Sequence, residues 1–359
     1  MKLLCKIFSF PFIILGTAVA LLLVISGWSS YLYTPAMPAL SLTGMAFPAI
    51  LIANLLFALF WGVFRSRAIW IQLAAIILTI TPILQYSPLH AFHPSAGGPD
   101  NSIRLLSYNV HFFEDINGDQ PYDLTNPIIN YLSNSDADII CLQEPNIPIL
   151  QRQFKNKDFL PEMKYMYPSR GTNIAVMSRW PILEWKEIHF PESRNRSLYC
   201  RILRGTDTIA VYNCHFQSFE LKQNEIDDYH NFIEHPKDTV SYHGMASAIR
   251  KLSKAAVKRA GQVQAIDSML DCETARYIIL CGDFNDTPLS YAHRIISGKL
   301  TDAYVKTGFG PGISYNLNRL YFRIDHVFCN GNLIPVRCKV DKSISSCDHY
   351  PVNCVFNLR

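Results

Sequence analysis

The sequence predicts an α/β (α+β) four-layer sandwich, in which two packed, mostly antiparallel β-sheets are flanked by helices, preceded by an N-terminal helical transmembrane region. All 29 acidic residues lie at or beyond Asp100, whereas residues 7–64 contain no Asp, Glu, Lys or Arg. Beyond residue 101, short apolar and β-branched runs alternate with turn residues, which is typical of strands. Few helical segments separate these runs, which favours sheet packed on sheet over a doubly wound parallel sheet.

The membrane region is predicted to comprise residues 1–86, with three transmembrane helices at about residues 7–28, 44–64 and 68–85. Each run has roughly the length that crosses a ~30 Å hydrocarbon core, and the third is the shortest and most polar. A cleaved signal peptide is the alternative for the first run. That run is longer than a typical signal-peptide core and further apolar runs follow it, so we favour a span.

Basic residues near the apolar runs predict the orientation in the membrane. Lys2 and Lys6 precede the first run, and Arg65 and Arg67 lie between the second and third. Because cytoplasmic loops are enriched in Lys and Arg, the N-terminus and the Arg65 turn are predicted to be cytoplasmic. Three spans then place the remaining chain on the extracytoplasmic side of the cytoplasmic (inner) membrane. If the third run were only interfacial, that part would be cytoplasmic.

The net charge of +4 is accounted for by these same four basic residues, so the rest of the chain is neutral overall. A neutral domain provides no long-range field for nucleic acid, and any phosphate binding must be local. Residues 87–101 form a predicted linker and residues 102–359 the second domain. Its predicted helix at residues 247–270 carries basic residues that are best explained as a solvated face. These are Arg250, Lys251, Lys254, Lys258 and Arg259.

The elements of the second domain follow from its apolar runs. A helix is predicted at residues 125–134 in addition to that at 247–270. Strands are predicted at residues 104–110, 137–143, 173–178, 198–203, 208–215, 277–283, 324–328 and 352–356. Most cysteines lie within these strands and are interpreted as small buried hydrophobic residues, and no C-x-x-C spacing suggests zinc. A disulfide between Cys200 and Cys214 is a hypothesis that the sequence leaves open.

Polar residues stand at the ends of six of the apolar runs, where a sheet would hold their tips in place. Taken singly, each has an ordinary explanation as a turn residue, a solvated strand end or a structural histidine. They are Asn109, Glu144, His215, Asp283 with Asn285, Asp325, and Asp348 with His349.

Together, these residues and their neighbours resemble the deoxyribonuclease-I-like endonuclease/exonuclease/phosphatase superfamily, over residues 102–359 and not over the membrane region. The matching motifs are Ser107-Tyr108-Asn109-Val110, Gln143-Glu144, Asn173 to Pro181, Asn213-Cys214-His215, Gly282-Asp283-Phe284-Asn285 and Ser346-Cys347-Asp348-His349-Tyr350-Pro351. Cys347 departs from the serine expected before the Asp-His pair. The resemblance implies a hydrolase that acts on phosphoester bonds.

Phosphoester hydrolysis needs a hard cation, positive donors and an activated water, because the anionic oxygens repel a nucleophile. Oxygen ligands favour Mg²⁺ or Mn²⁺. Glu144 is the best single candidate ligand, with Asn109 and Asp348 nearby.

The resemblance also implies roles for the other polar residues. Asp283 would orient or deprotonate the attacking water, and Asn285 would hold the phosphate. His215 and His349 would donate hydrogen bonds to the phosphate oxygens. Asp325 would pair with one of these histidines and fix its tautomer. Which group is the general base stays open.

Two substrates fit this chemistry: lipid headgroups or other small phosphodiesters, and nucleic acid in an extracytoplasmic nuclease. A non-catalytic membrane scaffold that keeps the fold is the alternative of another class. The membrane is the predicted partner, and the sequence indicates no protein partner. The long segment at residues 219–246, with His230, His235 and His243, is interpreted as a substrate-shaping loop in preference to a second metal site.

Overall fold

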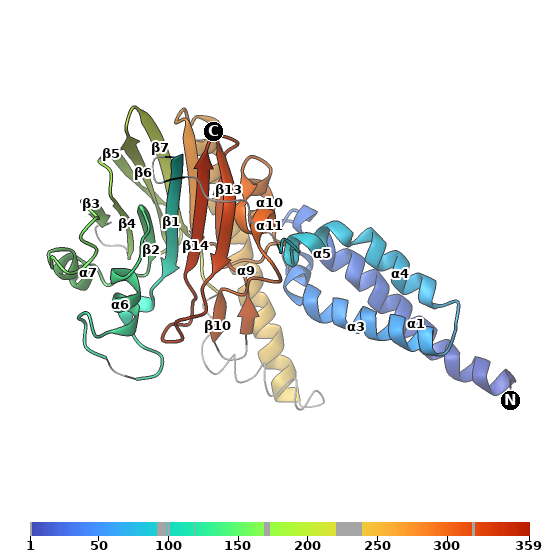
Figure 1. Cartoon of the computed structure of the whole chain (residues 1–359). Coiled ribbons are helices and arrows are strands. Elements are labelled where there is room, and N and C mark those ends of the chain that lie inside the picture. The colour runs from blue at the N-terminus through green and yellow to red at the C-terminus, as the bar shows by residue number, and fades with distance from the viewer. Residues whose placement is uncertain are drawn as a thin grey trace.

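The computed structural model describes residues 2–91, 98, 101–118, 120–168, 173–219, 239–317 and 320–359. A bundle formed by the first helices packs against one side of a β-sandwich, and the N-terminus lies at the end of the bundle far from the sandwich (Figure 1). The predicted loop histidines His230 and His235 lie outside the described residues, as does the side chain of His243.

The N-terminal bundle contains apolar helices that match the predicted runs. Its elements are α1 (Lys2–Gly27), η1 (Ser29–Tyr31), α2 (Pro38–Ser41), α3 (Thr43–Val63), α4 (Ile69–Leu78) and α5 (Ile80–Tyr86). Within the described chain, α1 and α3 are long and apolar enough to cross a membrane. Helices α4 and α5 meet at 62° and would provide a third span if they form one unit.

The bend between α4 and α5 differs from the continuous helix predicted at residues 68–85. It lies at Thr79, whose hydroxyl donates to the carbonyl of Ala75 at 2.7 Å. Pro82, one turn further, cannot donate a helical hydrogen bond. The indole nitrogen of Trp28 donates to the carbonyl oxygen of Leu78 at 3.0 Å, so a side chain satisfies a backbone group at the break.

The bundle contacts the sandwich directly. Ser29 Oγ donates to the carbonyl of Leu289 at 2.9 Å, and Gln85 Nε2 donates to that of Pro288 at 2.7 Å. In the other direction, Arg294 Nε donates to the carbonyl of Ser30 at 2.8 Å. The side chain of Leu289 is buried in the apolar cluster of the bundle. The contact therefore joins the ends of α1 and α5 to the segment that follows β8.

The sandwich consists of two six-stranded sheets in the described part of the chain. The first has the order β13 (Leu333–Val340), β14 (Val352–Leu358), β1 (Ser102–Asn109), β2 (Ile139–Gln143), β4 (Ile174–Ser178) and β3 (Tyr165–Pro168). The second has the order β5 (Ile182–His189), β6 (Arg196–Arg204), β7 (Asp207–His215), β8 (Tyr277–Asp283), β12 (Asp325–Cys329) and β9 (Thr301–Asp302). Only β1 with β2 and β7 with β8 pair in parallel among these strands.

Helices cover the outer faces of both sheets. Helices α6 (Pro127–Ser133) and α7 (Ile147–Phe154) pack on β1 and β2, while α9 (Thr239–Asp271) and α10 (Tyr291–Ser297) pack on β7 and β8. The connection from β9 to β12 contains helix α11 (Ala303–Thr307) and a hairpin of β10 (Tyr315–Leu317) and β11 (Leu320–Phe322). An apolar core fills the space between the sheets. The predicted sandwich of two mostly antiparallel sheets flanked by helices is confirmed.

The strands that the sequence prediction missed are edge strands or short. β5 and β13 each lie at an edge; β5 is mostly exposed and β13 alternates exposed residues with buried ones, which weakens the apolar signal used to find strands. Helix α9 begins at Thr239, eight residues before the predicted start.

Two interpretations of single side chains are corrected. The nine cysteines from Cys141 onward are free thiols. Cys200 lies in the core between the sheets and Cys214 in the cluster under α9, so they face opposite sides of their sheet and the hypothesis of a disulfide between them is wrong. Arg259 on α9 is fully buried, not part of a solvated face.

Candidate active site

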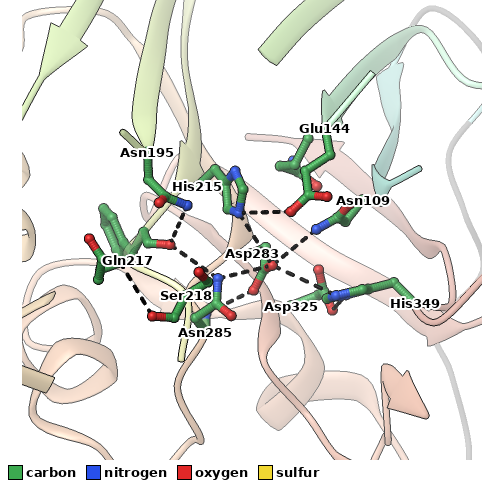
Figure 2. A network of polar contacts seen from close by, with 12 residues as sticks. Asn109, Glu144, Asn195, His215, Gln217, Ser218, Asp283, Asn285, Asp325 and His349 are labelled. Carbon is green, nitrogen blue, oxygen red and sulfur yellow. Dashed lines mark hydrogen bonds and ion pairs between the residues drawn. The ribbon is translucent and has the colours of Figure 1, made fainter. Parts of the chain in front are cut away.

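The predicted site residues converge at one end of the sandwich, where β1, β2, β7 and β8 finish and β12 begins. Figure 2 shows Asn109, Glu144, His215, Asp283 and His349 pointing toward one another. The paired parallel strands bring their carboxyl ends to the same edge, which is why residues far apart in the sequence meet here. The structure thus brings the eight predicted residues into one region.

Glu144 is the residue after β2, and its backbone is held on both sides. Its amide donates to the carbonyl of Asn173 at 2.8 Å, and its carbonyl accepts from the amide of Phe112 at 2.7 Å. Its φ of 53° is left-handed, which costs a non-glycine residue roughly 1–2 kcal/mol. The surrounding contacts hold Glu144 in this conformation, and the side chain stays partly open to solvent.

His111 was missed by the sequence prediction, although it follows Asn109 by only two residues. Its Nδ1 lies 3.7 Å from Asp348 Oδ1 and 4.0 Å from Glu144 Oε2. His111 begins a turn, η3 (His111–Phe113), in which three successive residues have positive φ. Such conformations occur mainly where surrounding structure imposes them, often at functional sites. The position just after a strand that ends in a site residue is the only sequence signal for His111.

His215 ends β7 and faces two carboxylates. Its Nε2 lies 3.4 Å from Glu144 Oε1 and 3.8 Å from Asp283 Oδ2. This nitrogen is buried and has no hydrogen-bond partner among the described residues. It can therefore donate to a substrate oxygen without giving up a bond within the protein.

Asp283 ends β8 and lies at the centre of the site. Its carboxylate accepts from Asn109 Nδ2 at 3.1 Å and from the amide of Asn285 at 2.8 Å. Burial raises the pKa of Asp283 to about 6; nearby His349 lowers it and nearby Asp325 raises it. A buried carboxylate with a pKa near neutrality is suited to accept a proton.

His349 is positioned by Asp325, at the start of β12. Its Nδ1 lies 2.9 Å from Asp325 Oδ2, and its Nε2 lies 3.8 Å from Asp283 Oδ2. Burial opposes a charge on His349, but Asp325 and Asp283 outweigh it and raise the pKa of His349 well above its ordinary value. The imidazole is therefore protonated at neutral pH and presents a positive donor to the site.

Asn285 lies beside Asp283 in a left-handed conformation, with φ 51°. Its Nδ2 donates to the carbonyl of Phe216 at 3.1 Å and to Asp283 Oδ2 at 3.2 Å. Both amide hydrogens are thus used within the protein. Contact with phosphate through this amide requires exchange of one of these bonds, so the predicted phosphate-holding role of Asn285 stays a prediction.

Buried polar groups behind the site hold the loop after β8. Arg259 Nε donates to Asp286 Oδ2 at 3.0 Å and its Nη1 donates to the carbonyl of Gln217 at 3.0 Å.

Cys347, which departs from the family motif, donates from its thiol to the carbonyl of Asn109 at 3.3 Å. A thiol thus supplies a hydrogen bond at the position where a serine was expected.

Gly282 is required by the approach of β7 to β8. Its φ is 129°, and a Cβ at this position would collide with the backbone carbonyl oxygen of Cys214. Replacing Gly282 with Ala should lower the free energy of unfolding by about 3 kcal/mol, measured as a lower melting temperature of the full chain. In the matched control, Gly261→Ala on α9, no described atom beyond the chain neighbours and the local helix backbone lies within 4 Å of the added Cβ. That change should be neutral or stabilise by up to about 1 kcal/mol, and equal melting temperatures for both variants would contradict the steric argument.

The donors at the site suit a hard divalent cation. Glu144 and Asp348 provide carboxylate oxygens on either side of His111, and Asn109 provides an amide oxygen that accepts from the amide of His111 at 3.2 Å. Such ligands favour Mg²⁺ or Mn²⁺ over softer metals. Elsewhere in the described chain, His293, Asp302 and His326 form a second buried group of potential ligands. Hydrogen bonds occupy this group, including one of 2.7 Å between His293 Nε2 and Asp302 Oδ2.

Comparisons with known proteins give a matching family model and structures with the same fold. The model of the Endonuclease/Exonuclease/phosphatase family matches residues 106–346, and that of a domain of unknown function matches residues 6–86. A humanized TDP2 of D. rerio with 14 mutations is 16% identical, with a TM-score of 0.51 over 71% of this chain and 99% of that chain.

The D. rerio TDP2 complexed with a single-strand DNA product is 15% identical, with the same TM-score of 0.51 over 71% of this chain and 99% of that chain. The human Nocturnin catalytic domain with a bound sulfate anion is 13% identical, with a TM-score of 0.49 over 72% of this chain and 95% of that chain. The TDP2 likenesses show the shared fold. No curated protein sequence matches the chain.

Proposed function

Because the chain belongs to the Endonuclease/Exonuclease/phosphatase family, we propose that it is a divalent-metal-dependent phosphodiesterase anchored in the cytoplasmic membrane, with its catalytic domain on the extracytoplasmic side. Members of this family hydrolyse phosphoester bonds and use divalent metals. The observation that carries the proposal is the convergence of Glu144, His215, Asp283 and the Asp325–His349 pair within hydrogen-bond or ion-pair distances.

In the proposed mechanism, each side chain has a defined task. Asp283 accepts a proton from the attacking water. His215, with its unpartnered Nε2, and His349, protonated through Asp325, donate to the phosphate oxygens as negative charge develops. Glu144, Asn109 and Asp348 would hold Mg²⁺ or Mn²⁺, which when bound neutralises charge on the phosphate and makes water more acidic.

The arrangement of the bundle supports the extracytoplasmic placement. The N-terminus lies far from the sandwich, whereas Ser29 and Gln85 bond to it. The connection at residues 65–68 joins α3 to α4 at the end of the bundle that is far from the sandwich (Figure 1). The basic residues of the bundle thus lie at the end opposite the catalytic domain, as cytoplasmic positive charge would require.

Among candidate substrates, small or lipid-borne phosphodiesters fit better than nucleic acid, because the chain outside the bundle carries no net charge. The test is a screen of the full chain in lipid nanodiscs with Mg²⁺ or Mn²⁺. DNA, RNA, sphingomyelin, phosphoinositides and bis(p-nitrophenyl) phosphate serve as substrates. Metal-dependent turnover of the last, abolished by EDTA, is expected. No turnover of any substrate with either metal would favour the non-catalytic scaffold.

The pH dependence should reflect Asp283. The pKa of Asp283 is raised to about 6, and only its ionised form can act as a base. kcat/KM should therefore be low at acid pH and increase as Asp283 loses its proton. A bound cation lowers this pKa toward the ordinary carboxyl value of about 4. We therefore expect the increase in kcat/KM at a pH between about 4 and about 6. Rates measured from pH 4 to 9 at saturating Mg²⁺ test this, and a profile that is flat across pH 4 to 7 would exclude Asp283 as the base.

A further inference from the structure

A cavity of about 220 Å³ opens beside the catalytic residues and is not used by the mechanism above. Glu144 and His215 are among the residues that line it, so the cavity is continuous with the catalytic centre. The segment from Arg194 to Arg196, which leads into β6, also lines it. This segment provides two arginines within one residue of each other.

Neither arginine is neutralised by the described part of the protein. No side-chain hydrogen bond or ion pair joins Arg194 or Arg196 to another described residue, and Arg196 Nε is buried without a partner among them. Other arginines nearby are paired, as Arg201 is with Glu273 at 3.1 Å. A buried guanidinium nitrogen without a partner is costly, and an anionic ligand in the cavity would satisfy it.

The backbone that carries these arginines is held in place. Asn195, between them, donates from Nδ2 to the carbonyl of Phe216 at 2.9 Å, and its amide donates to Ser193 Oγ at 3.2 Å. Arg196 is paired with His189 in the β5–β6 ladder. Because Phe216 follows His215, the arginine segment and the catalytic histidine are fixed relative to each other.

We propose that this cavity is a second anion subsite, in which Arg194 and Arg196 bind a further phosphate of the substrate while the scissile phosphoester lies at Glu144 and His215. This rests on the proposed function and narrows its substrate class to phosphoesters that carry a second phosphate. Guanidinium groups bind phosphate through paired, charge-assisted hydrogen bonds. A choline headgroup is excluded by the same charges, because its ammonium group would face two unpaired cations.

The subsite favours a compact substrate over a polymer. Binding along a nucleic acid requires a series of basic contacts, and the chain outside the bundle has no net charge to provide a long-range field. Two arginines that line one small cavity, Arg196 half-buried and Arg194 exposed, match one additional phosphate. The source of that phosphate, a soluble nucleotide or a lipid headgroup, is distinguished by experiment.

The experiment compares kcat/KM of the full chain in nanodiscs on matched substrates with and without the second phosphate. One arm uses the dinucleotide TpT with and without a 5′-phosphate. The other uses phosphatidylinositol and phosphatidylinositol 4-phosphate in phosphatidylcholine vesicles. In at least one arm, the second phosphate should raise kcat/KM about tenfold or more, mainly through KM, as expected for one or two charge-assisted bonds.

The double variant Arg194→Gln/Arg196→Gln should reduce this ratio to about one. Arg337→Gln, at an exposed position on β13, removes a comparable charge away from the cavity and should leave the ratio unchanged. Melting temperatures confirm that each variant folds. Turnover of bis(p-nitrophenyl) phosphate by the wild type tests the proposed function separately.

If that substrate is hydrolysed but the ratio is near one in both arms, or survives the double substitution, the subsite is wrong while the phosphodiesterase stands. A preference found only for long DNA, increasing with length and falling steeply with salt, would also overturn it. In that outcome the arginines contact a nucleic acid backbone.

Discussion

Replacing Glu144 with Gln should lower kcat/KM for phosphodiester hydrolysis by about 10³-fold or more, which corresponds to about 4 kcal/mol of transition-state stabilisation. Glu144 supplies a carboxylate that is partly open to solvent and held by its backbone in a fixed, left-handed conformation. Glutamine keeps the size of this side chain but removes the negative charge that holds a divalent cation. Glu144→Ala should have an effect at least as large.

The readout is a titration of activity with Mg²⁺ and with Mn²⁺. In Glu144→Gln, the metal concentration for half-maximal activity should increase and the maximal rate should fall. Glu162→Gln, an exposed carboxylate away from the site, serves as the charge-matched control and should behave as the wild type. An unchanged metal dependence in the Glu144 variant would remove this residue from the metal site.

The second large effect is expected for Asp283→Asn, which should reduce kcat by about 10³-fold. The side chain is buried and accepts hydrogen bonds from Asn109 and Asn285, and the amide oxygen of asparagine can keep part of this network. What it loses is the ability to take a proton and to balance the charge of His349, which lies 3.8 Å away. The expected loss is therefore in the rate, with little change in KM.

Asp207→Asn is the control for this substitution, because Asp207 pairs with Arg276 at the other end of the sheet, away from the catalytic residues. It should retain full activity. Single-turnover measurements separate chemistry from product release. If Asp283→Asn kept more than about a tenth of the wild-type rate, the proton would have to pass to another group, with His215, 3.8 Å from Asp283, the alternative.

The sequence was sufficient to predict those parts of the fold whose position follows from the local pattern of apolar and polar residues. Buried central strands such as β2 and β8 are continuous apolar runs, and the residue after each run, Glu144 or Asp283, lies at the sheet edge by simple geometry. The order of these motifs along the chain also carried the resemblance to the family. Their chemical roles remain predictions.

Other features depend on contacts that no local pattern encodes. Arg259 lies on the same helix as the other basic residues, and its burial depends on two partners distant in the sequence, the carboxylate of Asp286 and the carbonyl of Gln217. His111 reaches the site through a left-handed turn that a sequence of non-glycine residues does not suggest. The bend at Thr79 lies within an apolar run, and the tertiary bond from Trp28 that accompanies it comes from a distant helix.

The contact between the bundle and the sandwich has a mechanical consequence for catalysis. Pro288 and Leu289, whose carbonyls accept from Gln85 and Ser29, are within six residues of Asp283. The backbone amide of His90, four residues after α5, also donates to the carbonyl of Gly308 at 3.1 Å. If the bundle spans the bilayer as proposed, the site has a set height and tilt above the lipid surface and does not swing on a tether. A lipid-borne substrate would then reach the site by diffusion along that surface. We expect a fragment cut free of the bundle to expose Leu289 and loosen the catalytic loop.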